Sequence, residues 1–224
     1  MSDIDTETCI RIRELYTLDE TIAKPLLEKY TYPWEVLPHI SEYIIELIDT
    51  LPKDIYEEKG ENIWIAKSAK IYPNNYIAGP CIIGERTEVR PGAFIRGNAL
   101  VGNDCVVGNS TELKNVILFN HVQVPHYNYV GDSILGFYSH MGAGSITSNV
   151  KADKTLVHVK HGDTDIETGL KKFGAMLGDH VERGCNSVLN PGSIICNDSN
   201  VYPVSMVRGV VPPHCIYKED RKSV

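Results

Sequence analysis

The first candidate chemistry in this sequence is anion binding by two cationic side chains. Arg96 and Lys114 each follow an aliphatic residue and lie 18 positions apart. If one turn of the fold takes 18 residues, these side chains stack on one face, with Cα atoms about 5 Å apart. Stacked like charges repel each other unless an anion bridges them or an acid neutralises them. A phosphate held by both side chains and neutralisation by Glu112 are both compatible with the spacing.

A possible proton acceptor follows in the segment 124–132, whose order predicts that His126, Asn128 and Tyr129 lie near the same face. Histidine is the usual general base near neutral pH. A lone histidine is more often a surface residue, but one beside a cationic pair and a tyrosine favours catalysis. We therefore predict His126 as the catalytic base, with His140, one turn later, as a second catalytic residue that orients or assists it.

A zinc hydro-lyase is a competing class of enzyme. His121 and His126 are five positions apart, which resembles two of the three zinc ligands of hexapeptide-type carbonic anhydrases. Catalytic zinc needs three protein ligands and a water. No histidine occurs between His39 and His121, where the third ligand would fall. The sequence therefore predicts no metal site, and the zinc enzyme is kept as an alternative.

The element that positions these residues is a repeat of six. Helices and free strands have periods of 3.6 and 2, so this period indicates short strands joined by tight corners, with three strands per triangular coil. We predict an all-β, parallel β-helix of roughly seven coils, left-handed as is typical of the hexapeptide family. In the continuation of the repeat from 177 to 207, Arg183 is the one non-aliphatic residue at an anchor position. The uninterrupted anchors are Ile65, Ile71, Ile77, Ile83, Val89, Ile95, Val101, Val107 and Leu113.

The remaining segments divide the chain further. Residues 1–60 are predicted to form a helical extension, in which an apolar stripe from Leu37 to Leu51 covers the open end of the first coil or a neighbouring subunit. The solenoid is expected over 61–211, interrupted by a protruding hairpin at about 149–173. Residues 212–224 are predicted to be a tail, disordered at its charged end.

Several stretches resemble the acetyltransferase domain of the bifunctional UDP-N-acetylglucosamine pyrophosphorylase/glucosamine-1-phosphate acetyltransferase. The later segments 169–179 and 190–192 are more similar to archaeal sugar-1-phosphate nucleotidylyltransferases that carry the same type of domain. The resemblance covers about residues 63–211, and its most specific part is 126–132. It is carried by residues 95–96, 107–115, 124–132 and 142–147, and by Asn149.

The resemblance implies a homotrimer that binds acetyl-CoA and an amino-sugar phosphate between subunits, in UDP-N-acetylglucosamine biosynthesis. By matched position, the sugar phosphate would be held by Arg96, Lys114, Tyr129 and Asn149. The same match implies that His126 accepts the amine proton and that the backbone at Ala143 contacts the acyl donor. The family has an asparagine where this chain has His140, which puts the acyl-donor contact in question. Arg90 lies in a look-alike motif but is expected on another face.

Composition excludes several classes. A net charge of −7 argues against a nucleic-acid partner. No apolar run approaches the ~18 residues of a membrane span, and the N-terminus lacks a signal-peptide pattern. Six cysteines without a CxxC motif favour reduced thiols in the cytoplasm. With no Gly-rich phosphate loop, nucleotidylyltransferase activity is not expected. A non-catalytic trimeric scaffold or sugar-nucleotide-binding protein is the second alternative.

Overall fold

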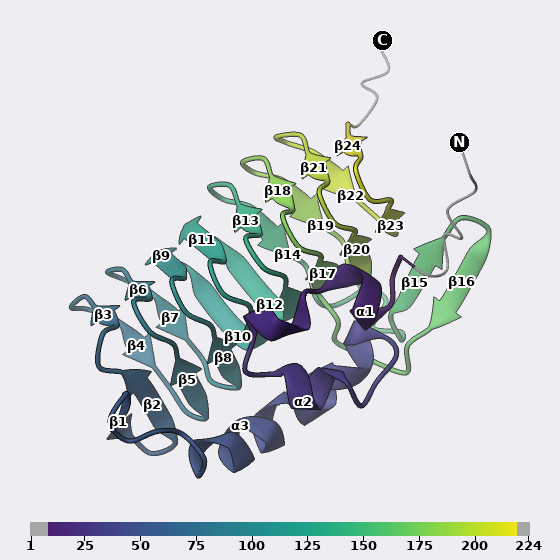
Figure 1. The fold of residues 1–224 in the computed structure, drawn as a ribbon. Helices are drawn as coiled ribbons and strands as arrows, with labels where there is room; N and C mark the ends of the chain where they lie inside the picture. Colours follow the sequence, from purple (N-terminus) through teal and green to yellow (C-terminus); the bar gives the residue numbers. More distant parts are fainter. Residues whose placement is uncertain (1–8, 219–224) are drawn as a thin grey trace.

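A computed structural model describes residues 9–218 as a parallel β-solenoid with three faces (Figure 1). Face 1 consists of β4 (Tyr76–Ile77), β7 (Phe94–Ile95), the first halves of β10 (Glu112–Leu118) and β12 (Tyr129–Leu135), β14 (Ile146–Thr147), β19 (Val188–Leu189) and β22 (Met206–Val207). Face 2 consists of β2 (Ile63–Ala66), β5 (Cys81–Ile83), β8 (Ala99–Val101), the second halves of β10 and β12, β17 (Ala175–Leu177), β20 (Ser193–Ile195) and β23 (Val210–Val211). Face 3 consists of β3 (Lys70–Ile71), β6 (Glu88–Val89), β9 (Val106–Asn109), β11 (Gln123–His126), β13 (His140–Met141), β18 (Glu182–Arg183), β21 (Asn200–Val201) and β24 (Ile216–Tyr217).

The repeat of six is confirmed as the origin of this architecture. Each anchor points into the prism, and Val89, Ile95 and Val101, one on each face, are fully buried. Coils stack in parallel register, with Ile95 beside Leu113 and Lys114 beside Gly131. This is the parallel solenoid expected of a left-handed β-helix.

The solenoid is slightly longer than the sequence suggested. Within residues 9–218, face 3 has eight strands, compared with roughly seven predicted coils. The difference lies at the C-terminal end, where β24 pairs with β21 through Asn200 and Ile216. Part of the predicted tail 212–224 therefore belongs to the last coil, and residues 219–224 lie outside the described range.

Arg183, the exception among the anchors, is buried in the core. Its guanidinium donates to the carbonyl oxygens of Ile146 and Ser187 at 3.1 and 2.6 Å and to the Ser187 hydroxyl at 3.1 Å. Burial lowers the pKa of Arg183 to about 9. Nη1 has no hydrogen-bond partner among the described residues, so the carbonyls and the hydroxyl replace only part of the water that an exposed arginine would bind.

The N-terminal extension packs along the side of the solenoid (Figure 1). Its stripe was expected to cover the open end or a neighbouring subunit, but α3 contacts β5, β8 and β10 on face 2. The extension is also not wholly helical, because β1 pairs antiparallel with β2. Its elements are α1 (Ile12–Leu15), η1 (Leu18–Glu20), α2 (Lys24–Leu27), η2 (Pro33–His39), α3 (Ile40–Ile48) and β1 (Tyr56–Gly60).

The outward side chains of face 2 explain this position. The residue before each inward anchor is apolar on this face, so an uncovered face 2 would expose a continuous hydrophobic strip. The extension removes that strip from water. The strip consists of Ile82, Leu100, Ile117, Ile134, Met176 and Ile194, each at most 1% exposed.

We predict that Leu100→Ala lowers the free energy of unfolding by about 3 kcal/mol, because it opens a cavity in this covered strip. Urea denaturation measures the change. Ile45→Ala is the control: Ile45 lies on α3 but is 48% exposed, and the loss of its side chain should cost less than about 0.5 kcal/mol. Equal losses in the two variants would contradict burial of face 2 by the extension.

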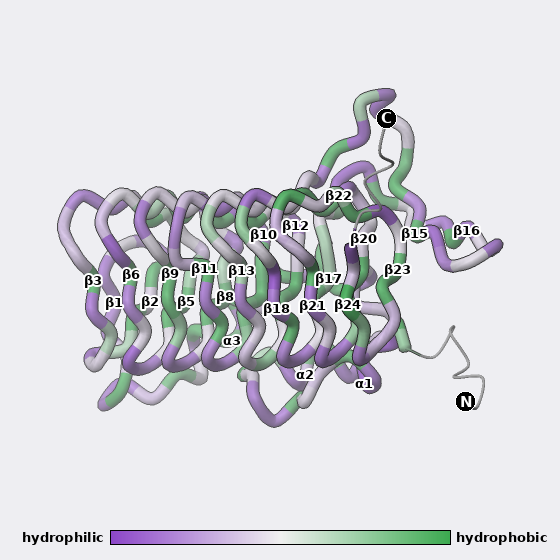
Figure 2. The backbone as a smooth tube through the Cα atoms, turned by 90° about the horizontal axis from the view of Figure 1, so that it is seen from above, coloured by the Kyte–Doolittle hydropathy of each residue, from purple (hydrophilic) through white to green (hydrophobic). Residues whose placement is uncertain are grey.

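The interruption after β14 contains an antiparallel pair, β15 (His158–His161) and β16 (Thr164–Glu167). Figure 2 shows this hairpin projecting beyond the row of coils. Its base is anchored, because Val157, Val159 and Phe173 are buried and β15 contacts β20 and β23. Within residues 9–218, no helix is long and apolar enough to cross a membrane.

Candidate functional site

Arg96 and Lys114 lie in adjacent coils, at the edge where face 1 turns into face 2. The Arg96 backbone amide donates to the carbonyl of Leu113 at 2.9 Å, which is the expected stacking. Each cation has an acidic partner: Arg96 Nη1 is 2.8 Å from Glu112 Oε1, and Lys114 Nζ is 2.9 Å from Asp132 Oδ1. Of the two possibilities left open by the spacing, the structure therefore contains neutralisation by acids, with Asp132 as well as Glu112 taking part.

Asp132 is the centre of the site. It is only 3% exposed, and its carboxylate accepts hydrogen bonds from Lys114 Nζ at 2.9 and 3.0 Å. The side-chain amides of Asn115 and Asn149 donate to it at 3.0 and 2.5 Å. These hydrogen bonds replace the water that a buried carboxylate loses, so Asp132 holds these three side chains in fixed positions. We call the set Arg96, Glu112, Lys114, Asn115, Tyr129, Asp132 and Asn149 the Asp132 cluster.

Tyr129 reaches this cluster by lying over a glycine. A Cβ on Gly131 would come within 2.4 Å of the Tyr129 hydroxyl oxygen, so the absence of a side chain there makes room for the ring. Burial, together with the charges of Asp132 and Glu112, raises the pKa of Tyr129, while a hydrogen bond from Asn149 opposes the rise. The phenol therefore stays protonated at neutral pH and can donate a hydrogen bond to an anion.

Two segments outside the repeat hold the Asp132 cluster in place. The carbonyl of Leu37 in η2 accepts a hydrogen bond from Asn115 Nδ2 at 3.2 Å. Asn149, the first residue of the interruption, accepts from the Phe173 amide at 3.0 Å, and the rings of Trp34 and Phe173 stack at 5.9 Å. The cluster thus lies where the N-terminal extension and the interruption meet.

His126 lies at the other edge of face 1, at the end of β11. Its side chain is exposed, its amide donates to Asn128 Oδ1 at 3.1 Å, and its carbonyl accepts from Gly144 at 3.0 Å. Asn128, expected near the cationic pair, instead points into the prism and donates to the Gly142 carbonyl at 2.9 Å. Its role is to fix the corner between His126 and Tyr129.

His140 is not brought to His126 within one chain. It is in register with Gln123, three residues before His126, which is about 10 Å along a strand. Its Nδ1 is 2.8 Å from Glu182 Oε2. A direct contact through which His140 would orient His126 is therefore absent from the described chain.

Ala143 lies beside a shallow groove of about 450 Å³ that runs along the edge between faces 3 and 1. Its carbonyl accepts from the Asn186 amide at 2.8 Å. Successive coils come very close at this edge, since a Cβ on Gly184 would lie 2.3 Å from Pro203. The groove is lined by His140, Gly142, Glu182, Arg183, Gly184, Cys185, Asn200, Val201, Tyr202, Pro203 and Ile216.

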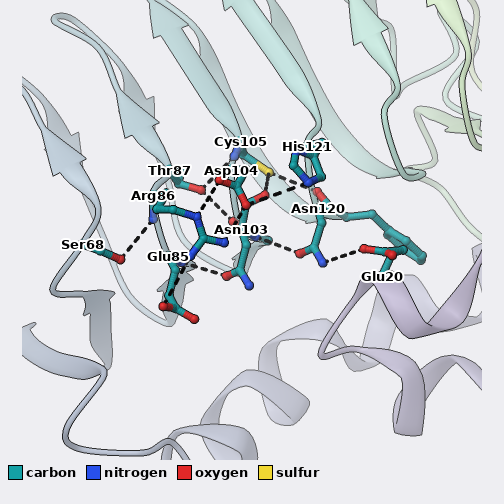
Figure 3. A network of polar contacts seen from close by, with 12 residues as sticks. Glu20, Ser68, Glu85, Arg86, Thr87, Asn103, Asp104, Cys105, Asn120 and His121 are labelled. Carbon is teal, nitrogen blue, oxygen red and sulfur yellow. Dashed lines mark hydrogen bonds and ion pairs between the residues drawn. The ribbon is translucent and has the colours of Figure 1, made fainter.

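The histidines of the zinc alternative are separated by β11: His126 is its last residue, and His121 lies in the corner two residues before its first residue, Gln123. Figure 3 shows His121 in a ladder of corner side chains, with Nε2 3.9 Å from Asp104, which pairs with Arg86 at 2.7 Å. The His121 ring stacks on Tyr138 at 4.4 Å. In the described part of the chain, no three His, Cys, Asp or Glu side chains are grouped to hold a metal ion.

The structure therefore brings together the four side chains predicted for substrate binding, Arg96, Lys114, Tyr129 and Asn149, and leaves His126, His140 and Ala143 along the opposite edge. Sequence reasoning missed Asp132 and Asn115. Asp132 directly follows Gly131, the register partner of Lys114, so allowing for the 17-residue coil between Leu113 and Val130 could have placed Asp132 next to this cation. Arg90 follows β6 on face 3 and pairs with Glu88 at 3.3 Å, away from the cluster.

Taken together, the solenoid and its polar edge define a hexapeptide-repeat protein with a built cluster at one corner. The chain belongs to the GMPPB C-terminal domain family, whose model matches residues 77–215, more than half of the chain.

Curated relatives include the bifunctional protein GlmU of Methanococcus maripaludis, 32% identical over 192 residues, which are 84% of this chain and 46% of the relative. A bifunctional sugar-1-phosphate nucleotidylyltransferase/acetyltransferase of Sulfurisphaera tokodaii is 32% identical over 155 residues, 69% of this chain and 38% of the relative. The chain thus spans less than half the length of these relatives.

Solved structures that resemble the chain include PerB from Caulobacter crescentus in complex with CoA and GDP-perosamine. The identity is 17% and the TM-score 0.36, over 69% of this chain and 52% of PerB. Another is the N-acyltransferase AntD from Bacillus cereus, with 17% identity and a TM-score of 0.38, over 77% of this chain and 83% of AntD.

Proposed function

We propose that this chain is an acyltransferase that uses acetyl-CoA to N-acetylate an amino-sugar phosphate. The observation that carries the proposal is the Asp132 cluster, which gathers Arg96, Lys114, Tyr129 and Asn149 at one corner. Two cations, a protonated phenol and an amide form a donor set suited to a phosphate and sugar hydroxyls. The similarity to the bifunctional relatives, one of which is called an acetyltransferase by name, supports the same class.

Phosphate binding requires an exchange of partners in this cluster. Arg96 is about half exposed, so its guanidinium can leave Glu112 and pair with a phosphate at little cost in buried charge. Lys114 is more buried and stays with Asp132, so it adds positive charge from a fixed position. Arg96 is thus the mobile contact of the proposed site, and Lys114 is the fixed one.

The proposed reaction takes place along face 1. The amine nitrogen attacks the thioester carbonyl carbon of acetyl-CoA, the carbon–sulfur bond breaks, and the CoA thiolate leaves. His126 accepts the proton that the amine loses and passes it to the thiolate or to water. The groove beside Ala143 would hold the pantetheine arm, because its lining combines apolar side chains, among them Val201, Pro203 and Ile216, with the polar side chains of His140 and Asn200.

Completion of this site by a neighbouring subunit is part of the proposal. Faces 1 and 3 of the last coils carry exposed apolar side chains that suit a second copy of the chain: Tyr202, Val204, Met206 and Ile216, at 46 to 62% exposure. A homotrimer would also bring acyl-donor and sugar-phosphate contacts from different chains together. Sedimentation equilibrium should then give three times the chain mass of 25.0 kDa. A monomer at micromolar concentration would contradict this part of the proposal.

The activity is tested by incubating the purified chain with acetyl-CoA and glucosamine 1-phosphate and measuring thiol release with a disulfide dye and N-acetyl product by mass spectrometry. We expect turnover that needs both substrates. Failure with glucosamine 1-phosphate and with a panel of other amino-sugar phosphates would overturn the proposal.

Gly131→Ala is a sharper test of the cluster. The added methyl group must push aside the Tyr129 ring, which is the far end of a flexible side chain, so stability should change by less than about 1 kcal/mol. We expect KM for the sugar phosphate to rise about tenfold with a smaller change in kcat, because one donor moves away. Tyr129→Phe, which keeps the ring and removes the hydroxyl, should raise KM similarly. Unchanged KM in both variants would remove Tyr129 from the site.

A non-catalytic scaffold that binds a sugar nucleotide is the second candidate. It is favoured by one observation: both cations already have carboxylate partners, so the corner is electrically balanced without a ligand. This candidate predicts that sugar nucleotides bind, measured by calorimetry, while no thiol is released from acetyl-CoA.

A further inference from the structure

A second chemical site lies at the far end of the solenoid, away from the Asp132 cluster. Cys9 and Cys196 are 187 positions apart, yet their sulfur atoms are 3.1 Å from each other. Cys9 lies three residues before the start of α1, and Cys196 directly follows β20. None of the six cysteines, which all lie within residues 9–218, forms a disulfide, so the pair is present as two thiols.

The two thiols have different roles. Cys196 donates its S–H to Cys9 Sγ, and a hydrogen bond and charge from His161 on β15 add to this stabilisation of the Cys9 thiolate. These interactions lower the pKa of Cys9 despite burial. The hydrogen bond that Cys196 donates to Cys9, together with burial and the neighbouring Cys9 charge, raises the pKa of Cys196. Cys9 is therefore the nucleophile of the pair, and Cys196 is the thiol held next to it.

The backbone around the pair is already docked. Asn197 Nδ2 donates to the carbonyl of Glu14 at 2.9 Å, and the Asp179 amide donates to the carbonyl of Leu15 at 3.0 Å. A disulfide has an S–S distance of about 2.05 Å, so closing the pair requires a movement of about 1 Å between segments already held together. Hydrogen bonds to Asn197 and Asp179 thus prepare the geometry for a cross-link.

We propose that Cys9 and Cys196 are a redox modification site, which forms a reversible disulfide with a peroxide as oxidant and fastens the N-terminal extension to the last coils. The Cys9 thiolate attacks one oxygen of hydrogen peroxide, the O–O bond breaks, and hydroxide leaves to become water. The sulfur of Cys196 then attacks the Cys9 sulfenic acid, the S–O bond breaks, and a second water leaves. In total two thiols lose two electrons and two protons, and one peroxide is reduced to two waters.

The other cysteines provide controls. Cys81 and Cys105 are fully buried, and burial raises the pKa of each to about 12, so neither should react. Cys185 is exposed and lies on the opposite edge of the prism, so it should react with alkylating reagents without forming this cross-link. Cys215 lies close enough to Cys196 to influence its ionisation and is the competing partner.

The experiment treats the full chain with stoichiometric hydrogen peroxide, alkylates the remaining thiols, and identifies linked peptides by mass spectrometry with and without reduction. We expect a Cys9–Cys196 peptide, formed equally in Cys185→Ser and Cys215→Ser and absent in Cys9→Ser. His161→Gln should slow its formation about tenfold, since the thiolate loses a partner. A sulfinic acid on Cys9 without a cross-link, or a Cys196–Cys215 link instead, would overturn the proposal. These outcomes are read on the wild-type chain, so they do not depend on the folding of any variant.

A second measurement tests whether the disulfide stabilises the packing of the N-terminal extension against the last coils. Oxidised wild-type chain should unfold several degrees higher than reduced chain, because the cross-link constrains nearly the whole unfolded chain. The difference should vanish in Cys196→Ser. Equal melting temperatures in wild type would show that the cross-link does not fasten the extension.

Discussion

His126→Gln is expected to lower kcat for acetyl transfer by about 10²- to 10⁴-fold, with little change in KM for the sugar phosphate. Loss of a general base removes a contribution of that size, and glutamine keeps a similar shape without accepting a proton near neutral pH. His126 is exposed at the end of β11 and lies outside the buried network around Asp132, so the variant should fold as the wild type does. Steady-state thiol release with both substrates varied separates kcat from KM.

His140→Gln is the matched control for this prediction. His140 is partly exposed on the same face, pairs with Glu182, and lies about 10 Å from His126 along the strands. A decrease of less than tenfold is therefore expected. If both variants lose kcat equally, the two histidines act together across subunits. If His126→Gln retains full activity, the acyltransferase mechanism with His126 as base is wrong.

Lys114→Met is expected to lower the free energy of unfolding by about 3 kcal/mol, the second large effect. Its ammonium gives two hydrogen bonds to Asp132, whose side chain is 5% exposed, and methionine leaves that carboxylate without a charged partner. Removing one member of a buried ion pair is costly because the other charge stays out of water. Urea denaturation at neutral pH gives the change.

Adding Asp132→Asn to Lys114→Met should recover part of the lost stability, because an amide is cheaper to bury than an unpaired carboxylate. The double-mutant cycle then yields a coupling of at least about 1 kcal/mol. Additive losses would show that Lys114 and Asp132 contribute independently, and that Asp132 is held by Asn115 and Asn149 alone.

The architecture could be predicted from the sequence because the repeat of six is a local code. Each anchor such as Ile95 or Leu113 must point inward, whatever the distant chain does, and three such strands close a coil. The 18-residue length of a coil likewise predicted that Arg96 lies beside Lys114. The resemblance added Tyr129 and Asn149, and the structure places both in the same cluster.

The partners of these side chains could not be read from the repeat. Whether Arg96 faces a bound phosphate or Glu112 depends on rotamers and on the charge balance of the corner, which a period does not contain. Asn128 and Tyr129 are neighbours in sequence, but one points into the prism and the other lies over Gly131. By position, His140 corresponds to an asparagine of the family. Its contact with Glu182 could not be read from that match, because Glu182 lies in the next coil, which begins only after the interruption.

The solenoid, its coil length and the row of polar residues along one edge could be predicted from the sequence, since all three follow from short-range periodicity. The folded structure was needed to show that the N-terminal extension covers face 2, that η2 and Asn149 complete the Asp132 cluster, and that Cys9 meets Cys196. These contacts join segments outside the repeat to coils up to 187 positions away, and no regular spacing encodes them. The extension lies along the prism because this position buries the apolar strip on face 2, and the same packing places η2 and Cys9 against the coils.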